Sequence, residues 1–306
     1  MGKLIVSLSP HAHGNDSVER NMYGVIIALL PALLASFYFF GIGSAIVCAT
    51  SVVACVLFEW AIGKYLLKTT RCTVCDGSAA LTGLLLGMNL PSNLPIWIII
   101  IGALVGRCFL LVSFPTAMTS WPVPGQLTAY TDATTAATPL SVMQRAIKGE
   151  DVLDQLPSSI DLLVGNNGGT VGEVCAIALL IGFAYMLWKK IITWHIPVSI
   201  LLTVFVIAGA LHLCDSETYA SPLHVILSGG LMLGAIFMAT DYVTSPMCPK
   251  GQIIYGISIG ALTVIIRNWG AYPEGMSFAI LIMNAFTPLI NMYVKPKRFG
   301  EVPAKK

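Results

Sequence analysis

Long apolar stretches, separated by short polar ones, dominate the chain. A transmembrane helix needs about 20 mostly apolar residues, with a working range of about 17–25. Several stretches satisfy this criterion and are predicted to span a membrane: 22–40, 44–67, 96–114, 171–188, 193–213, 222–240, 252–269 and 277–294. A further apolar stretch, 78–90, is too short, because at about 1.5 Å per residue it covers only part of a hydrocarbon core about 30 Å thick. The pattern predicts an all-α integral membrane protein in which 78–90 is a tilted or half-length helix.

Composition supports this class and excludes others. Hydrophobic residues make up 56% of the 306 residues and charged residues only 10%, whereas a soluble domain carries about 25% charged residues. The net charge is +2, and the only Lys/Arg-rich tract is the tail 295–306. Membrane lipid is therefore the expected surrounding, and nucleic acid is not an expected partner. Most of the eight cysteines lie in or beside apolar stretches, so no disulfide framework is expected.

The positions of Lys and Arg indicate the orientation, because cytoplasmic loops collect positive charge. The cations between the stretches mark the cytoplasmic side: Lys64, Lys68, Arg71, Lys189, Lys190, Lys250, Lys295, Lys297 and Arg298. Asp215 and Glu217 stand without a nearby cation and mark the outer side. Both chain ends are then cytoplasmic, and segment 115–170, which precedes the outer start of 171–188, is external.

Counting crossings from a cytoplasmic N-terminus instead places 115–170 on the cytoplasmic side, because four apolar stretches precede it. Either 78–90 does not cross, or a crossing is missing between Pro95 and Pro115. An internal repeat bears on this conflict, since Leu81–Gly87 resembles Leu227–Gly234 and each lies in the third apolar segment of its half. Five segments in each half would make the halves inverted repeats. The expected organisation is an N-terminal segment, a first membrane repeat, an external segment, a second repeat and a tail, with bounds 1–21, 22–114, 115–170, 171–294 and 295–306.

Three motifs carry a family resemblance. Asp132–Pro139 reads Asp-Ala-Thr-Thr-Ala-Ala-Thr-Pro and, taken alone, is an ordinary Thr/Ala-rich loop. Pro222–Pro246 contains Ser-Gly-Gly-Leu-Met-Leu-Gly, and Ile266–Pro288 contains Gly-Ala-Tyr-Pro-Glu-Gly. Together these segments resemble the flavinylation motif and two signature runs of the Rnf D subunits and of their relative in the sodium-pumping NADH:quinone reductase, its B subunit. The resemblance extends over nearly the whole chain.

The resemblance implies a covalently bound flavin. In the family, the last Thr of Asp-x-x-Ser/Thr-x-Ala-Thr is joined through its hydroxyl to the phosphate of FMN. By position, this attachment residue is Thr138, and the rest of the motif is Asp132, Thr135, Ala136 and Ala137. A second, non-covalent flavin, riboflavin, is a further candidate cofactor.

The two other signatures suggest where the flavin lies. Gly229 and Gly230 are predicted to let a helix or a flavin ring approach the backbone closely. Arg267 and Glu274 are predicted to pair across a turn. No metal site is expected, because Cys72 and Cys75 supply only two of the four ligands that such a site needs.

The implied function is electron transfer in a multisubunit complex of the bacterial inner membrane. Such a complex passes electrons between ferredoxin and NAD while it moves Na⁺ or H⁺, and its other subunits, A, B, C, E and G, are the expected partners. This chain would be part of that translocating oxidoreductase without substrate turnover of its own. The implied fold has about nine to ten transmembrane helices in two inverted repeats, similar to urea transporters. Two alternatives remain open: a small-solute permease of the same helical fold, and the B subunit of a Na⁺-translocating NADH:quinone reductase.

One departure from the family coincides with the conflict in the count of crossings. The family has about two dozen further residues between the counterparts of Ala103 and Leu104. Here Ile101–Arg107 runs on without them. The missing crossing, the incomplete first repeat and this departure therefore point to one place in the chain.

Overall fold

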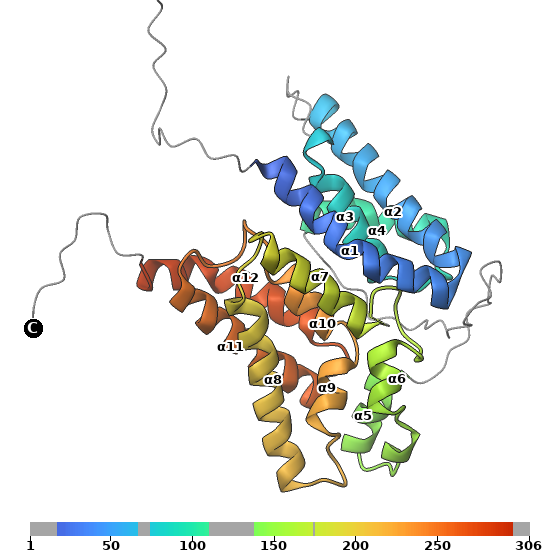
Figure 1. The fold of residues 1–306 in the computed structure, drawn as a ribbon, viewed down its shortest axis with the longest axis vertical. Coiled ribbons are helices and arrows are strands. Elements are labelled where there is room, and N and C mark those ends of the chain that lie inside the picture. The colour runs from blue at the N-terminus through green and yellow to red at the C-terminus, as the bar shows by residue number, and fades with distance from the viewer. Residues whose placement is uncertain (1–16, 67–73, 110–137, 174, 296–306) are drawn as a thin grey trace, which may run out of the picture.

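A computed structural model describes residues 17–66, 74–109, 138–173 and 175–295, and its regular elements are helices (Figure 1). Five of these helices are long and apolar enough to cross a membrane. They are α1 (Val18–Phe40), α2 (Ile42–Ala61, continued by the π-helical turn η1, Ile62–Leu66), α8 (His195–Cys214), α11 (Pro249–Trp269) and α12 (Met276–Tyr293). The prediction of a helical membrane protein is confirmed.

The remaining helices are shorter. Three are apolar: α3 (Ser78–Met88), α7 (Ala176–Trp188) and α4 (Ile96–Phe109), which is the described part of the predicted span 96–114. The others are η2 (Val74–Asp76), α5 (Pro139–Ile147), η3 (Leu153–Gln155), α6 (Ser159–Val164), α9 (Pro222–Leu227), α10 (Leu231–Leu233) and the π-helical turn η4 (Gly234–Met238). Stretch 78–90 is a short helix, as predicted.

Two predicted spans differ from the structure. The stretch 171–188 does not form one helix, because α7 begins only at Ala176 and a Gly-rich turn precedes it. The stretch 222–240 is also interrupted, since α9 ends at Leu227 and α10 begins at Leu231. Hydrophobicity alone does not reveal these interruptions, because the residues on both sides of each are apolar enough to read as one span.

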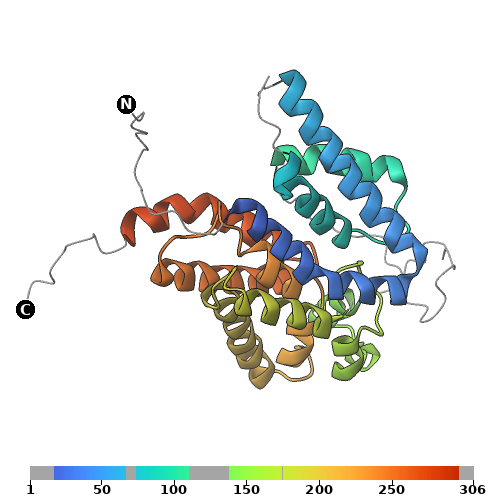
Figure 2. The ribbon, with the colours of Figure 1, turned by 45° about the horizontal axis from the view of Figure 1, so that its top comes forward.

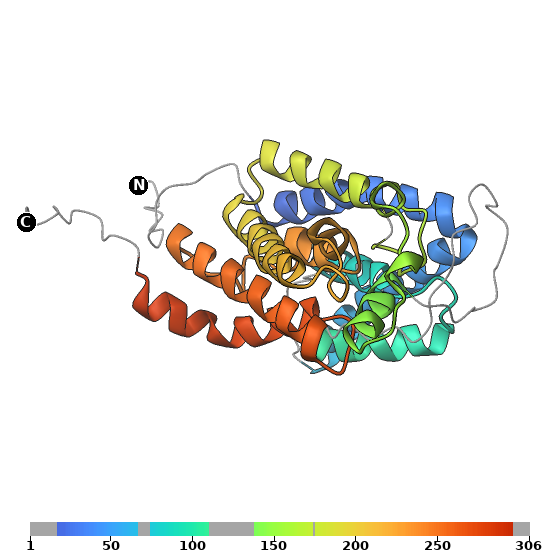
Figure 3. The same cartoon turned by 90° about the horizontal axis from the view of Figure 1, so that it is seen from below.

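Helix α1 packs against α7, which lies far away in the sequence. The buried face of α1 carries small residues at every fourth position: Gly24, Ala28, Ala32 and Ser36. Such a face lets two helices come close in a membrane, and Gly182 of α7 lies against the Ala28 carbonyl. Figures 2 and 3 show the two helices side by side. The core around them also takes in Leu84 of α3 and Phe237 of η4.

A second group of helices consists of α8, α11 and α12. Gly256 and Gly260 of α11 lie against α8 at Ser199 and Thr203, so these two helices run parallel. Helix α12 returns in the opposite direction, because Met276 at its start packs with Thr263 and Ile290 near its end lies against Gly251.

The bundle consequently has two chemically different ends. The starts of α8 and α11 meet where Thr193 Oγ1 donates to Gln252 Oε1 at 2.9 Å. Lys189, Lys190, Lys250 and Lys295 lie at this end, which we call the lysine end. The opposite end contains the end of α11, where Gln144 Nε2 of α5 donates to the Gly270 carbonyl at 3.1 Å. Helices α5 and α6 cover this second end, beside α9 (Figures 1 and 3).

Candidate functional site

The candidate site is built around the interruption between α9 and α10. Gly229 has φ +69°, a backbone conformation that residues with a Cβ rarely adopt. A Cβ added there would lie 2.6 Å from Glu274 Oε2 and 3.1 Å from an Arg267 terminal nitrogen. Glycine at this position therefore allows both the turn of the backbone and the close approach of two charged side chains.

Opposite charges stabilise the two helix ends that the interruption creates. Arg267 donates to the carbonyls of Val225 at 2.8 Å and Ser228 at 3.1 Å, at the end of α9. Glu274 accepts a hydrogen bond from the Gly230 N–H at 3.2 Å, at the start of α10. The helix dipole stabilises a cation at a helix C-terminus and an anion at a helix N-terminus. Each charged side chain thus replaces hydrogen bonds that a continuous helix would have made within itself.

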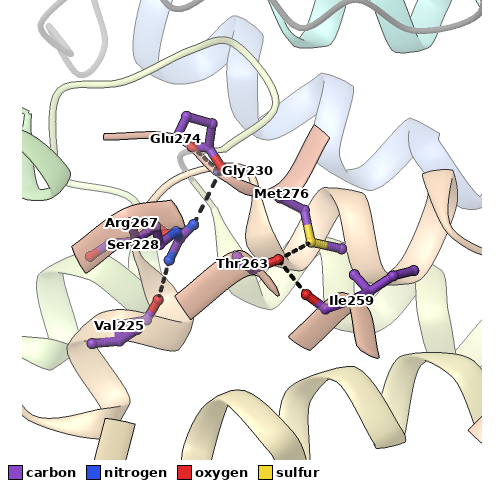
Figure 4. Close-up of polar contacts among 8 residues, drawn as sticks. All are labelled: Val225, Ser228, Gly230, Ile259, Thr263, Arg267, Glu274 and Met276. Atoms are coloured by element: carbon purple, nitrogen blue, oxygen red, sulfur yellow. Dashed lines mark hydrogen bonds and ion pairs between the residues drawn. The ribbon is translucent and has the colours of Figure 1, made fainter. Parts of the chain in front are cut away.

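Arg267 and Glu274 also pair with each other, at 3.4 Å (Figure 4). Their side chains are 6% and 18% exposed, so the pair lies inside the protein. The predicted pairing across the α11–α12 turn is confirmed. The sequence did not indicate that the same two residues would cap both halves of the third segment.

A second carboxylate reaches the interruption from the turn before α7. A Cβ added at Gly230 would lie 3.2 Å from Glu173 Oε1 and 3.9 Å from the carboxyl carbons of both Glu173 and Glu274. The carboxyl carbons of Glu173 and Glu274 are therefore separated by at most twice 3.9 Å. Glu173 was not identified from the sequence, although a lone acidic residue in a predicted span is the usual signal of a functional position.

Two buried polar atoms at the interruption have no hydrogen-bond partner within the described ranges. They are Ser228 Oγ, on a residue with 0% exposure, and Arg267 Nε. Leaving a buried polar atom unpaired costs about 1–3 kcal/mol. A further polar group at the interruption could therefore form hydrogen bonds with these two atoms.

Thr138 lies at the start of α5 and caps that helix. Its Oγ1 accepts from the Ser141 N–H at 3.2 Å, and Ser141 Oγ donates back to the Thr138 carbonyl at 2.8 Å. Pro139 occupies the first helical position, where it is favoured. Thr138 is partly exposed. The side chain is therefore held at the start of a nine-residue helix without being enclosed.

Helix α5 connects Thr138 to the interruption. Leu140, two residues after Thr138, approaches to 3.0 Å from the position of a Cβ at Gly229. The structure thus brings the predicted attachment residue and the predicted Gly-Gly pair into one region. Asp132, Thr135, Ala136 and Ala137 lie outside the described residues. That a flavin ring approaches Gly229 and Gly230 stays a prediction, because the groups seen there are protein side chains.

The loop after α8 is acidic. Hydrogen bonds from Thr218 and from the backbone lower the pKa of Asp215, so this carboxyl is ionised at neutral pH. Glu217 lies beside it, and both side chains are exposed. This acidic loop and the lysine end therefore lie at opposite ends of the bundle, and which end faces the cytoplasm stays a prediction.

Comparisons with known proteins identify the family. The model of the NQR2, RnfD, RnfE family matches residues 5–106 and 102–300, which is nearly the whole chain. The chain belongs to this family. The family match is split at residues 102–106, where the sequence showed a departure between Ala103 and Leu104.

Several curated relatives match over nearly their full length. The D subunit of the Na⁺-translocating ferredoxin:NAD⁺ oxidoreductase complex of Acetobacterium woodii is 42% identical, with 99% of this chain and 97% of the relative covered. The D subunit of the proton-translocating complex of Clostridium ljungdahlii is 37% identical, with 96% of each chain covered. The D subunit of the ion-translocating oxidoreductase complex of Yersinia pseudotuberculosis is 34% identical, with 98% and 99% covered.

The alignment with the Acetobacterium protein extends over 330 positions, more than the 306 residues of this chain. At least 24 positions of that alignment consequently have no residue here. This number agrees with the two dozen residues expected to be missing in the first half.

Proposed function

We propose that this chain is the flavin-bearing membrane subunit of a complex that couples electron transfer between ferredoxin and NAD to the translocation of Na⁺ or H⁺. Family membership over nearly the whole chain and the names of the 42% and 37% identical relatives support this proposal. The protein acts as an electron relay beside the other subunits, A, B, C, E and G, and turns over no substrate of its own.

The observation that carries the flavin part is the position of Thr138 as the cap of α5. FMN attached there supplies reversible one- and two-electron transfer when bound. Its phosphate, joined to Thr138 Oγ1, would lie at a helix N-terminus, where unpaired N–H groups and the helix dipole stabilise an anion. Partial exposure leaves the hydroxyl within reach of a modifying enzyme. The residues of α5 hold and orient the attachment point, and Leu140 couples it to the interruption.

We assign the lysine end to the cytoplasm and the end with α5 to the outer side of the bacterial inner membrane. Cytoplasmic loops are enriched in Lys and Arg, and four of the lysines counted in the sequence meet at one end of the bundle. The start of α1 lies at the same end, because Gly24 lies against Ile191. In this orientation Thr138 faces outward.

The proposed architecture is two inverted repeats, similar to urea transporters, with about nine to ten transmembrane segments in the family. Helices α1 and α7, the first of each half, run antiparallel, since Gly24 lies against Ile191 and Ala28 against Gly182. The third segments of the two halves also run in opposite directions. Helix α3 begins near Tyr23 at the lysine end, whereas α9 begins at the other end, beside Gly209 of α8. Inverted repeats place a site where the interrupted segments meet.

In-gel flavin fluorescence tests the attachment. The denatured protein, isolated from cells that contain the flavin transferase, should fluoresce at its own mass. Thr138→Ala should abolish the signal, because the phosphoester has no oxygen to form on. Thr138→Ser should retain the signal, and Ser141→Ala is the matched control for a neighbouring hydroxyl. Fluorescence that survives Thr138→Ala refutes the assignment, and an unsubstituted protein that never fluoresces favours the permease alternative.

A further inference from the structure

From the charges around Gly230 we infer that Glu173 and Glu274 together form a binding site for the translocated monovalent cation, H⁺ or Na⁺. The inference rests on the proposed membership of an ion-translocating complex. It does not depend on flavin attachment at Thr138.

The first argument is the balance of charge. Two carboxylates flank Gly230, and only one guanidinium, that of Arg267, lies among them. Within the described part of the chain, the charged groups that act on Glu173 are Glu274 and Arg267. With both carboxyls ionised the cluster carries one negative charge, and a single bound H⁺ or Na⁺ makes it neutral.

Other titratable groups on the surrounding helices do not change this balance. On α5, Arg145 is 45% exposed and pairs with Glu150 at 2.6 Å, and Lys148 is exposed. On α6, Asp161 is partly exposed and accepts from Ser158 Oγ at 2.7 Å. On α9, the His224 ring is engaged by Ser221 and by the Pro157 carbonyl.

The second argument is depth. Leu231, the first residue of α10, packs with Val204 at the midpoint of α8 and with Val264 of α11. The interruption therefore lies inside the helix bundle, halfway along α8 and near the outer end of α11, where Arg267 and the α11–α12 turn with Glu274 are. An uncompensated charge buried there is costly. The cluster is therefore stable as a neutral unit, with the cation bound.

The third argument is the supply of oxygen atoms. Besides the carboxylates, Ser228 Oγ is fully buried at the same interruption and has no partner among the described residues. Oxygen atoms are the ligands that hard cations take, and paired carboxyls can also share a proton. Interrupted helices that meet inside a bundle are typical places for such sites.

The test compares Glu173→Gln with Glu217→Gln in the complete complex reconstituted into vesicles. Glu217→Gln makes the same chemical change on an exposed loop residue and serves as the control. Ferredoxin-dependent NAD reduction and cation uptake are measured over a range of pH and of Na⁺ concentration. Glu173→Gln should remove the cation dependence seen in the unsubstituted complex, whereas Glu217→Gln should keep it. Loss of the Na⁺ dependence identifies Na⁺, and loss of the pH dependence alone identifies H⁺.

A carbodiimide that modifies protonated carboxyls in apolar surroundings provides a second measurement if Glu173→Gln is inactive. Peptide mass spectrometry of the unsubstituted complex should find Glu173 or Glu274 modified, and Na⁺ or a higher pH should protect it. Unchanged pH and Na⁺ dependence in an active Glu173→Gln complex overturns the inference, and so does an inactive variant combined with no protectable modification. A complex with no ferredoxin:NAD activity before any substitution refutes the proposed function instead.

Discussion

Replacing Gly229 by alanine tests whether the capped interruption depends on glycine. At φ +69° an alanine is strained by about 1–2 kcal/mol. Its Cβ would also lie 2.6 Å from Glu274 Oε2, so the carboxylate has to move away. Hydrogen bonds to charged groups contribute about 1.5–3 kcal/mol each. Losing one of them in addition to the strain gives a destabilisation of about 2.5–5 kcal/mol.

Gly209→Ala is the matched control. Gly209 lies inside α8 with ordinary backbone geometry, and an added Cβ would meet only Pro222 Cγ at 3.5 Å, a normal contact. Alanine in a helix interior is favoured over glycine by about 0.8–1.0 kcal/mol. The two glycine substitutions should therefore change stability in opposite directions.

The assay is pulsed alkylation of Cys48 in the folded complex. Cys48 is a buried free thiol in the same core as Leu233 of α10, so it becomes reactive when that core opens. Because 1.4 kcal/mol corresponds to a factor of ten, Gly229→Ala should increase the labelled fraction by about sixtyfold or more. Equal labelling of the Gly229→Ala and Gly209→Ala proteins would show that Glu274 and Arg267 do not need the glycine, and would refute the account of the interruption.

Two further predictions concern the charged caps and the orientation. Arg267→Met should destabilise the protein by about 3–5 kcal/mol, because Glu274 remains buried without its partner, whereas Glu274→Gln should cost less, since an amide oxygen can still accept from the α10 N-terminus. The same thiol assay measures both, and a larger loss for Glu274→Gln would contradict the capping scheme. For the orientation, Glu150→Cys should react with a membrane-impermeant maleimide from the periplasmic side and Lys189→Cys only from the cytoplasm. Reversed labelling would refute the assignment of the lysine end.

The long spans were predictable from the sequence because length and hydrophobicity suffice for a helix such as α8. The interruption of 222–240 was not, since Leu227 and Leu231 continue the apolar run on either side of it. The helix is interrupted because Gly229 adopts a left-handed conformation and because Arg267 and Glu274 cap the two ends. These charged residues come from another part of the chain, so only the tertiary structure brings them to Gly229. The pairing of Arg267 with Glu274 was predictable because the two residues flank one short turn.

Sequence reasoning found Thr138 only through the family resemblance. A Thr followed by Pro is nevertheless a regular signal for the start of a helix, and α5 does begin there. Glu173 was missed because it stands near the start of the predicted span 171–188, with no motif around it. Only the fold brings this residue beside Gly230, so its partnership with Glu274 could not have been read from spacing.

The contact between α1 and α7 has a consequence for biosynthesis. Gly182 meets the Ala28 carbonyl, yet roughly 150 residues separate them, which at about 5–20 residues per second takes roughly 8–30 s to synthesise. During that interval the small-residue face of α1, with Gly24 and Ala32, has no α7 to pack on. Newly inserted α1 must therefore wait in lipid or against another protein. A membrane insertase that shields this face until α7 emerges would protect it during that interval.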